Sequence, residues 1–190
     1  MVDRTREASV DRRPDVLRDQ SGIAVDDLQR LWAPWRTAYI TRGDAIDGCP
    51  FCVLPARGTS ADRASLVLHR GEHAYVILNA YPYNPGHAMV VPFEHIADVG
   101  DLDHTSSDEF WQLTRLTVTV VREQLGASGI NVGMNLGAVS GAGIADHLHQ
   151  HVVPRWPGDT NFMSVVGASR VLPSALDDVY TSLVDGFRRA

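Results

Sequence analysis

The chain has 190 residues, 44% of them hydrophobic, and this length suits one domain with a core of ordinary size. Its formal net charge of −6 excludes a protein whose main task is to coat nucleic acid, because that task needs a basic face. Residues 1–30 lack the apolar stretch of a signal peptide, and no later apolar run approaches the roughly 18 residues that span a membrane, so we expect a cytoplasmic protein.

Residues 1–22 alternate arginine and aspartate and hold few large apolar side chains. Such a segment cannot bury enough surface to offset the entropy lost on ordering the chain. We therefore predict a mobile N-terminal arm over 1–22 and a single domain over 23–190. Residues 25–32 can form a short helix, and the tryptophans of LWAPWR (31–36) favour packing in a core or an interface.

Three strand-like runs follow in the middle of the chain. They are SLVLHR (65–70), AYVILN (74–79) and HAMVVP (87–92), and turn-forming residues separate them at Gly71-Glu72 and at Asn84-Pro85-Gly86. Three strands so close together in the sequence predict an antiparallel meander.

A long helix is predicted after the meander. Ser106 to Glu109 has the form of a capping box, and Gly126 can end the helix after Leu125. A final helix is predicted to begin at Ser174, and its apolar stripe comprises Leu176, Val179, Tyr180, Leu183, Val184 and Phe187.

Two more strands are predicted between these helices, INVGMNLG (130–137) and HLHQHVV (147–153). The segment AVSGAGIAD, rich in small residues, joins them. The pattern as a whole predicts an α+β fold, with an antiparallel sheet of about five strands, one long helix packed on it and a C-terminal helix.

His147, His149 and His151 alternate with other residues in the last third of the chain. In a strand they share one face, with a step of about 6.6 Å between successive histidines. They can form a surface strand or a metal site with three histidines, but one metal would demand sharp curvature from residues so far apart. We favour a third interpretation, in which His149 is a nucleophile and its neighbours bind phosphate or serve a separate site.

The loop before this strand suits a phosphate. Gly137, Gly141 and Gly143 allow backbone amides to approach an anion closely, although a glycine-rich connection alone is weak evidence. Cys49 and Cys52 are the only cysteines, and their spacing allows a shared zinc ion, a redox pair or simple apolar packing. We favour zinc, which needs two further ligands.

The segment HLHQHVV resembles the signature of the histidine-triad superfamily, in which three histidines alternate with apolar residues; Gln150 occupies one of the apolar positions. The resemblance covers roughly residues 28–175 and is closest to the bacterial branch of diadenosine tetraphosphate phosphorylases, or ATP adenylyltransferases. The other similar segments are LWAPWR (31–36), CPFC (49–52), Asn79 with NPGHAMVVP (84–92), and HVVPRWPGDTNFM (151–163).

The resemblance implies a role for each site residue. His149 attacks the α-phosphorus to form a nucleotidyl-histidine, with His151 and His147 beside the phosphate. The expected nucleotide-binding residues are Asn79 on the ribose, His87 as a support for the triad, Asn135 and the amides of Gly141, Ala142 and Gly143 on phosphate oxygens, and Trp156, which stacks on a base or closes a dimer.

The resemblance also implies ligands for the metal and for the active site. His95 and His147 complete a structural zinc site with Cys49 and Cys52, so that His147 is contested between zinc and phosphate. The expected reaction converts diadenosine tetraphosphate and orthophosphate to ATP and ADP. Magnesium or manganese is the candidate ion accompanying the nucleotide, and at least a homodimer is expected.

Two alternative functions stay open at this point. The first is hydrolysis of a nucleoside phosphoramidate or dinucleoside polyphosphate, with water as the acceptor of the nucleotide. The second is a nucleotide-binding module without activity, for which the intact histidines at 147, 149 and 151 have no evident use.

Overall fold

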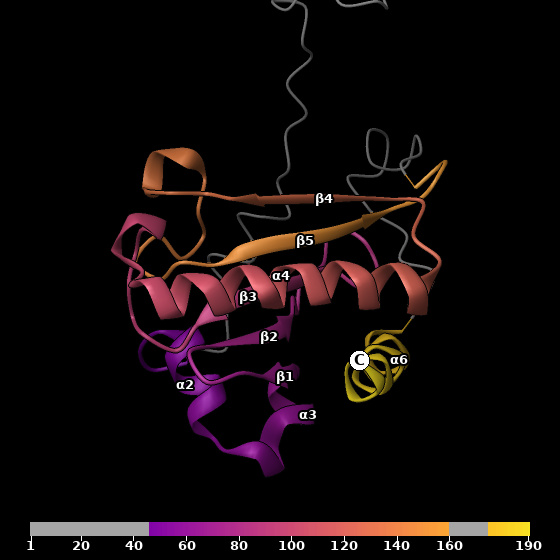
Figure 1. Cartoon of the computed structure of the whole chain (residues 1–190), viewed down its shortest axis with the longest axis horizontal. Helices are drawn as coiled ribbons and strands as arrows, with labels where there is room; N and C mark the ends of the chain where they lie inside the picture. The colour runs from indigo at the N-terminus through magenta and orange to yellow at the C-terminus, as the bar shows by residue number, and fades with distance from the viewer. Residues whose placement is uncertain (1–45, 160–174) are drawn as a thin grey trace, which may run out of the picture. The chain divides into compact units, whose positions relative to one another are not determined.

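The computed structural model describes residues 46–159 and 175–190. Within them the chain forms a five-stranded antiparallel sheet in the order β1-β2-β3-β5-β4 (Figure 1). The strands are β1 (Val67–Arg70), β2 (Ala74–Leu78), β3 (Ala88–Pro92), β4 (Gly129–Met134) and β5 (Gln150–Arg155). The predicted α+β fold, with its meander and two later strands, is confirmed.

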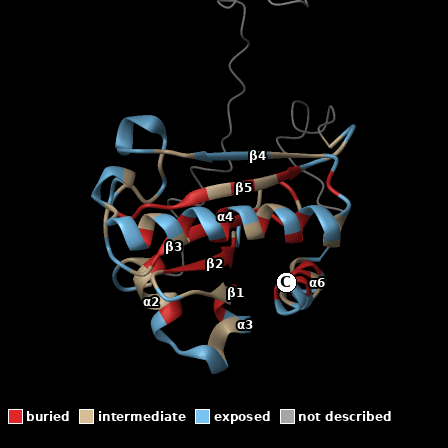
Figure 2. Cartoon of the chain, in the orientation of Figure 1, coloured by how far each residue is buried: buried red, intermediate tan, exposed pale blue. Residues whose placement is uncertain are grey.

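One face of the sheet is covered by helices. The helix α4 (His104–Leu125) lies across this face, and the C-terminal helix α6 (Leu176–Arg189) packs against α4 and β1 (Figure 1). Alternate residues of the strands, among them Val76, Val90 and Val152, belong to a buried core cluster with residues of these helices. Figure 2 shows the buried stretches of the central strands in red behind α4. This layer holds most of the hydrophobic core.

The other face of the sheet carries a smaller apolar cluster, formed by Phe51, Val67, Tyr75, Ile77, Met89 and Val91. Phe51 comes from the short helix α2 (Pro50–Ala56), and the remaining members come from β1, β2 and β3. Because side chains of a strand point alternately to the two faces, this cluster is separate from the core under α4. Further short helices are η2 (Thr59–Ala61), α3 (Asp62–Ser65), η3 (Val99–Asp101) and η4 (Ala138–Ser140).

The start of α4 differs from the prediction. The N-cap is Asp103, whose carboxylate accepts a hydrogen bond from the Ser106 backbone N–H at 2.7 Å, so the predicted capping box at Ser106 is wrong. Glu109 instead accepts hydrogen bonds from the backbone N–H groups of Glu72 and His73 in the β1–β2 turn. The predicted end at Leu125 is confirmed, with Gly126 in the left-handed conformation.

The last strand also begins later than predicted. β5 starts at Gln150, so His147 and His149 precede it, and only His151 lies within it. Gln150 is buried on the α4 face, where its side-chain oxygen accepts a hydrogen bond from the Thr114 hydroxyl at 2.5 Å. A polar residue is tolerated at this position because α4 supplies its partner.

Several predictions lie outside the described residues, namely the arm over 1–22, the helix over 25–32, the tryptophans of 31–36 and the Ser174 cap. The described part of α6 has Ala175 at its N-cap. No helix in the described ranges has the length and apolarity to cross a membrane.

Candidate active site

His149 and His151 lie on the face of the sheet that carries the smaller apolar cluster. Their ring centroids are 5.0 Å apart and their planes are nearly perpendicular, at 81°. His151 pairs in register with Met89 of β3, and its ring lies 5.1 Å from that of His87, just before β3. Two adjacent strands therefore bring three of the predicted site residues together.

The hydrogen bond of His149 determines which of its ring nitrogens can react. Its Nδ1 lies 2.8 Å from the backbone carbonyl oxygen of His147. A carbonyl only accepts, so Nδ1 carries the proton and donates it, and Nε2 is the unprotonated nitrogen. Burial lowers the pKa of His149, and the hydrogen bond to the His147 carbonyl opposes this in part. The ring is thus neutral at pH 7, as a nucleophile must be.

A second chain of hydrogen bonds runs through His87. The backbone N–H of Tyr83 donates to His87 Nδ1 at 3.1 Å, so neutral His87 carries its proton on Nε2. That nitrogen lies 2.9 Å from His151 Nδ1 and donates to it, which places the proton of a neutral His151 on Nε2. Burial, then the neighbouring His151 and His149, lower the pKa of His87 to about 3.

Two predicted nucleotide ligands lie near these histidines. The Asn79 side-chain amide is 3.4 Å from His87 Nδ1, and its oxygen accepts a hydrogen bond from the Tyr81 backbone N–H. Asn135 directly follows β4, whose last residue, Met134, pairs with Gln150. This register places Asn135 at the end of the sheet where His149 lies.

The glycine-rich loop between β4 and β5 is exposed at Gly141 and Gly143, with Ala142 half-buried between them. Gly141 has a φ of 88°, in the left-handed region that favours glycine. A hollow of about 440 Å³ separates this loop from the cysteines, and Gly143, Ile144 and Asp146 line it together with Cys49, Pro50 and His95. The end of the loop therefore lies beside the predicted metal ligands Cys49 and His95.

The predicted metal ligands converge. One ligand atom from each of Cys49, Cys52, His95 and His147 lies within 4.8 Å of the others. His147 Nε2 donates to the Pro92 carbonyl at 3.0 Å, so its unprotonated Nδ1 faces the two sulfur atoms, at 3.4 and 3.5 Å. Two thiolates and two imidazoles are a ligand set typical of structural zinc.

This geometry bears on the contested role of His147. Its ring is buried, with 1% of the residue exposed, and its two nitrogens face the Pro92 carbonyl and the cysteine sulfur atoms. The cysteines also differ from a simple apolar pair, because Cys52 Sγ lies 3.2 Å from His95 Nδ1. The side chain of His147 therefore belongs to the cysteine cluster, while its backbone carbonyl accepts the hydrogen bond from His149.

One predicted nucleotide-binding residue, Trp156, lies at the far end of β5. Its indole N–H donates to the Gly126 carbonyl at 3.0 Å, and the neighbouring Arg155 pairs with Asp159 at 2.6 Å. The structure does not bring the Trp156 side chain to His149.

Phe51 was missed by the sequence analysis. Its ring centroid is 4.9 Å from that of His149 and 5.5 Å from that of His147. Its position between the two cysteines of CPFC was the available signal. Tyr83 was missed as well: its backbone N–H donates to His87, and its ring stacks on the His87 ring with centroids 4.7 Å apart.

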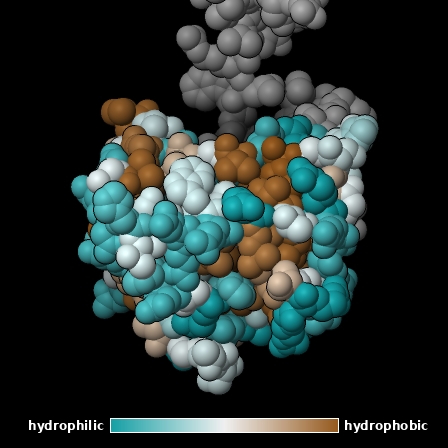
Figure 3. Space-filling model, in the orientation of Figure 1, coloured by the Kyte–Doolittle hydropathy of each residue, from teal (hydrophilic) through white to brown (hydrophobic). Residues whose placement is uncertain are grey.

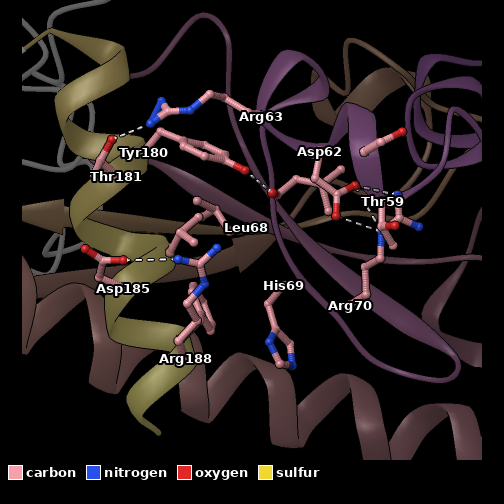
Figure 4. Close-up of a pocket in the computed structure, with 14 residues that line it drawn as sticks. Thr59, Asp62, Arg63, Leu68, His69, Arg70, Tyr180, Thr181, Asp185 and Arg188 are labelled. Carbon is pink, nitrogen blue, oxygen red and sulfur yellow. Dashed lines mark hydrogen bonds and ion pairs between the residues drawn. The ribbon is translucent and has the colours of Figure 1, made fainter.

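A larger hollow, of about 610 Å³, lies between α6, β1 and α3 (Figure 4). Its arginines are paired with carboxylates: Arg70 with Asp62, Arg188 with Asp185, and Arg63 with Asp177. These ion pairs leave no excess of positive charge to attract a phosphate. Neither of the two hollows is lined by His87, His149 or His151, and the smaller one is lined by the predicted metal ligands Cys49 and His95.

A sheet of this order, with histidines at the start of β5 facing a histidine before β3, defines a histidine-triad site, and residues 61–158 match the HIT domain family. The chain belongs to this family. It is 38% identical to "AP-4-A phosphorylase" of Mycobacterium tuberculosis, over 98% of this chain and 97% of the relative. It is 29% identical to "Bis(5'-adenosyl)-triphosphatase" of Saccharomyces cerevisiae, over 47% of this chain and 44% of the relative.

Solved structures agree on the fold. A Zn-bound histidine triad family protein from Mycobacterium smegmatis superimposes with a TM-score of 0.59 at 23% identity, over 75% of this chain and 94% of that chain. A histidine triad nucleotide-binding protein from Sulfolobus tokodaii superimposes with a TM-score of 0.55, also at 23% identity, over 74% of this chain and 90% of that chain. The match to the HIT domain family begins after the cysteines, so Cys49 and Cys52 lie outside it.

Proposed function

We propose that this chain is a nucleotidyltransferase that splits diadenosine tetraphosphate with orthophosphate into ATP and ADP. The observation that carries the proposal is the buried, neutral ring of His149, whose Nδ1–H bond to the His147 carbonyl leaves Nε2 unprotonated. The similarity to an AP-4-A phosphorylase over nearly the whole chain supports this choice of substrate.

The reaction has two displacements at the same phosphorus. His149 Nε2 forms a bond to the α-phosphorus while the bond from that phosphorus to the bridging oxygen breaks, and ATP leaves. An oxygen of orthophosphate then attacks the same phosphorus, the phosphorus–nitrogen bond breaks, and ADP leaves. A covalent intermediate lets two acceptors use one site in turn, and catalysis is largely positioning and neutralisation of charge.

The surrounding residues have supporting roles in this proposal. The Nε2–H of His151 donates to a phosphate oxygen, and His87 fixes that tautomer through its bond to His151 Nδ1. Asn79 binds the ribose, while Asn135 and the amides of residues 141–143 bind phosphate oxygens. Magnesium or manganese enters with the nucleotide, and zinc is the metal for Cys49, Cys52, His95 and His147. Four protein ligands make the zinc site structural, because no position stays open for water.

Hydrolysis is the second candidate, and the similarity to a triphosphatase over about half the chain favours it. Water then takes the place of orthophosphate in the second displacement, and AMP is released. The two reactions share the nucleotidyl-histidine and differ in the acceptor.

One experiment separates these possibilities. The protein is incubated with diadenosine tetraphosphate, with and without orthophosphate, and the nucleotides are separated by chromatography. We expect ATP and ADP only when orthophosphate is present. AMP formed without orthophosphate selects hydrolysis, and the absence of any turnover contradicts an enzymatic role.

The matched variants are His149→Ala and His104→Ala. Loss of the nucleophile should lower turnover on the order of 10⁴-fold or more, and labelled nucleotide should no longer remain on the protein after denaturation at alkaline pH, at which a phosphorus–nitrogen bond survives. His104, exposed on the first turn of α4, should tolerate the same change. Retained turnover in His149→Ala would remove His149 from its assigned role.

A further inference from the structure

The turn that holds the two cysteines also contacts the reactive histidine. Phe51, between Cys49 and Cys52, is 5% exposed, and its ring packs against the rings of both His149 and His147. The ring planes of Phe51 and His149 are tilted by 41°, so a flat aromatic surface lies along one side of the imidazole. Rotation of His149 about its side-chain bonds must therefore move past Phe51.

A second connection runs through His147. Its Nδ1 faces the two sulfur atoms, its Nε2 donates to Pro92, and its backbone carbonyl accepts the proton of His149 Nδ1. One residue thus links the cysteine cluster directly to the nitrogen that sets the tautomer of the nucleophile. Any shift of His147 when the metal binds or leaves is passed to that hydrogen bond.

The turn itself is fixed to the sheet. The hydroxyl of buried Tyr75, on β2, donates to the Phe51 carbonyl at 2.6 Å. The backbone N–H groups of Cys52 and Val53 both donate to the Cys49 carbonyl, which closes the first turn of α2. A ring carried on so constrained a backbone can hold its neighbour in one place.

We propose that the Cys49–Cys52 turn, with its metal bound, is a positioning element for the His149 ring, and that Phe51 is the positioning residue. This inference rests on the proposed function, because a fixed orientation of the His149 ring matters only if His149 is the nucleophile. Reacting groups must be held to within about 0.5 Å and 10–20° of the productive geometry, and the Nδ1 bond alone leaves the tilt of the ring undetermined. The rings of Phe51 and His151 both pack against the His149 ring, and Phe51 is the one of the two that comes from the cysteine turn.

The first test compares Phe51→Leu with Phe93→Leu. Phe93 packs against the same apolar cluster, but its ring stacks on Tyr75, with centroids 5.0 Å apart. In single turnover with diadenosine tetraphosphate, Phe51→Leu should form the nucleotidyl-enzyme about 10- to 100-fold more slowly, with little change in KM. Phe93→Leu should stay within about threefold of the unmodified protein. Equal rates for the two variants would overturn the proposal.

The second test needs no substrate. In the metal-loaded protein at alkaline pH, ¹⁵N spectra of the imidazoles should show His149 as a single Nδ1–H tautomer. Phe51→Leu, and the protein stripped of metal with a chelator, should show a mixture of tautomers, and restored zinc should return the stripped protein to one. The signal of exposed His104 serves as the control. A His149 signal unchanged in both states would contradict the inference.

The two tests separate failure of the proposal from failure of the proposed function. If the unmodified protein forms no nucleotidyl-enzyme, the proposed function fails, while the tautomer of His149 still decides whether the turn orders the ring. Far-UV circular dichroism establishes that each sample is folded. Phe51→Met, which fills more of the site, replaces Phe51→Leu if the smaller side chain prevents folding.

Discussion

Three histidines with identical side chains differ in chemistry here because each has a different partner on one ring nitrogen. His149 donates from Nδ1 to a carbonyl, and His147 donates from Nε2 to another carbonyl. His151 accepts at Nδ1 from His87. In the proposed function the other nitrogen of His149 is the nucleophile, that of His147 is a metal ligand, and that of His151 donates to phosphate. The residue type permits all three roles, and the hydrogen-bond partner selects one.

His87 should make the protein sensitive to acid. Its pKa in the folded state is about 3, against about 6.5 in an unfolded chain, so unfolding takes up a proton between these values. The contribution of His87 to stability is fully present above pH 6.5 and is lost as the pH falls toward 3. One such group contributes a slope of at most about 1.4 kcal/mol of unfolding free energy per pH unit.

The measurement is urea unfolding at a series of pH values from 7 to 4. His87→Gln should lower the slope of unfolding free energy against pH by up to the amount that one titrating group contributes, because glutamine does not titrate. Burial also lowers the pKa of His147 and His149, so part of the slope should persist. His104→Gln, at an exposed site, is the control. Identical slopes for both variants would contradict the assignment.

At the scale of elements, the turn between β2 and β3 depends on the end of α4. Gly86 has a φ of 81°, and a Cβ added there would lie 2.2 Å from Leu125 Cδ1. Gly58 has a similar φ of 86°, but nothing lies within 4 Å of its added Cβ. Alanine substitutions at these two glycines therefore distinguish the cost of a positive φ from the cost of crowding by Leu125.

Gly58→Ala should therefore lower the unfolding free energy by about 1 to 2 kcal/mol, because a positive φ with a ψ of 167° is a backbone conformation that alanine rarely adopts. Gly86→Ala should lower it by about 2 to 3 kcal/mol, since Leu125 must also move. Chemical denaturation of both variants measures the difference. A loss at Gly86 no larger than at Gly58 would show that Leu125 adjusts without cost.

For the whole molecule, the sequence predicted the elements better than the contacts between them. The alternation of apolar residues indicated all five strands, and Gly126 correctly marked the end of α4. The N-cap was assigned to Ser106 because the capping-box pattern is local, whereas Glu109 binds a turn 36 residues away. No local pattern contains a partner at that distance.

In the candidate site, too, the sequence indicated the residues better than it indicated their contacts. The spacing of the histidines and of the cysteines indicated which residues matter, and the cluster of four predicted metal ligands is confirmed as a geometry that can hold a metal. The start of β5, the orientation of His147 and the contact of Phe51 with His149 follow from tertiary packing. The roles of these residues in nucleotide transfer stay predictions.

The expected homodimer also stays a prediction. The edge strand β4 and the loop after it expose Val132, Leu136 and Val139, and hydrophobic side chains reach the surface over this loop (Figure 3). Single exposed hydrophobic residues are common on monomers, so these three side chains do not by themselves establish an interface.

Metal removal should affect the stability of the whole domain. Cys52 is 43 residues from His95 and 95 residues from His147, so one ion would join the start of α2 to the segments after β3 and before β5. A ligand that binds only the folded state stabilises it by about 4 kcal/mol at a thousandfold excess over its Kd. The zinc-loaded protein should therefore unfold at a higher urea concentration than the chelator-treated protein.

The variant Cys52→Ser should abolish this difference while leaving the stability of the metal-free protein nearly unchanged, because it replaces one sulfur atom with oxygen at a half-buried position. Elemental analysis should find one zinc per chain in the unmodified protein and none in the variant. If zinc raised the stability of both proteins equally, the ion would be bound elsewhere. If zinc raised the stability of neither protein, the four side chains would be a cluster that binds no metal. The contacts of His147 with the thiols would then be explained by hydrogen bonding alone.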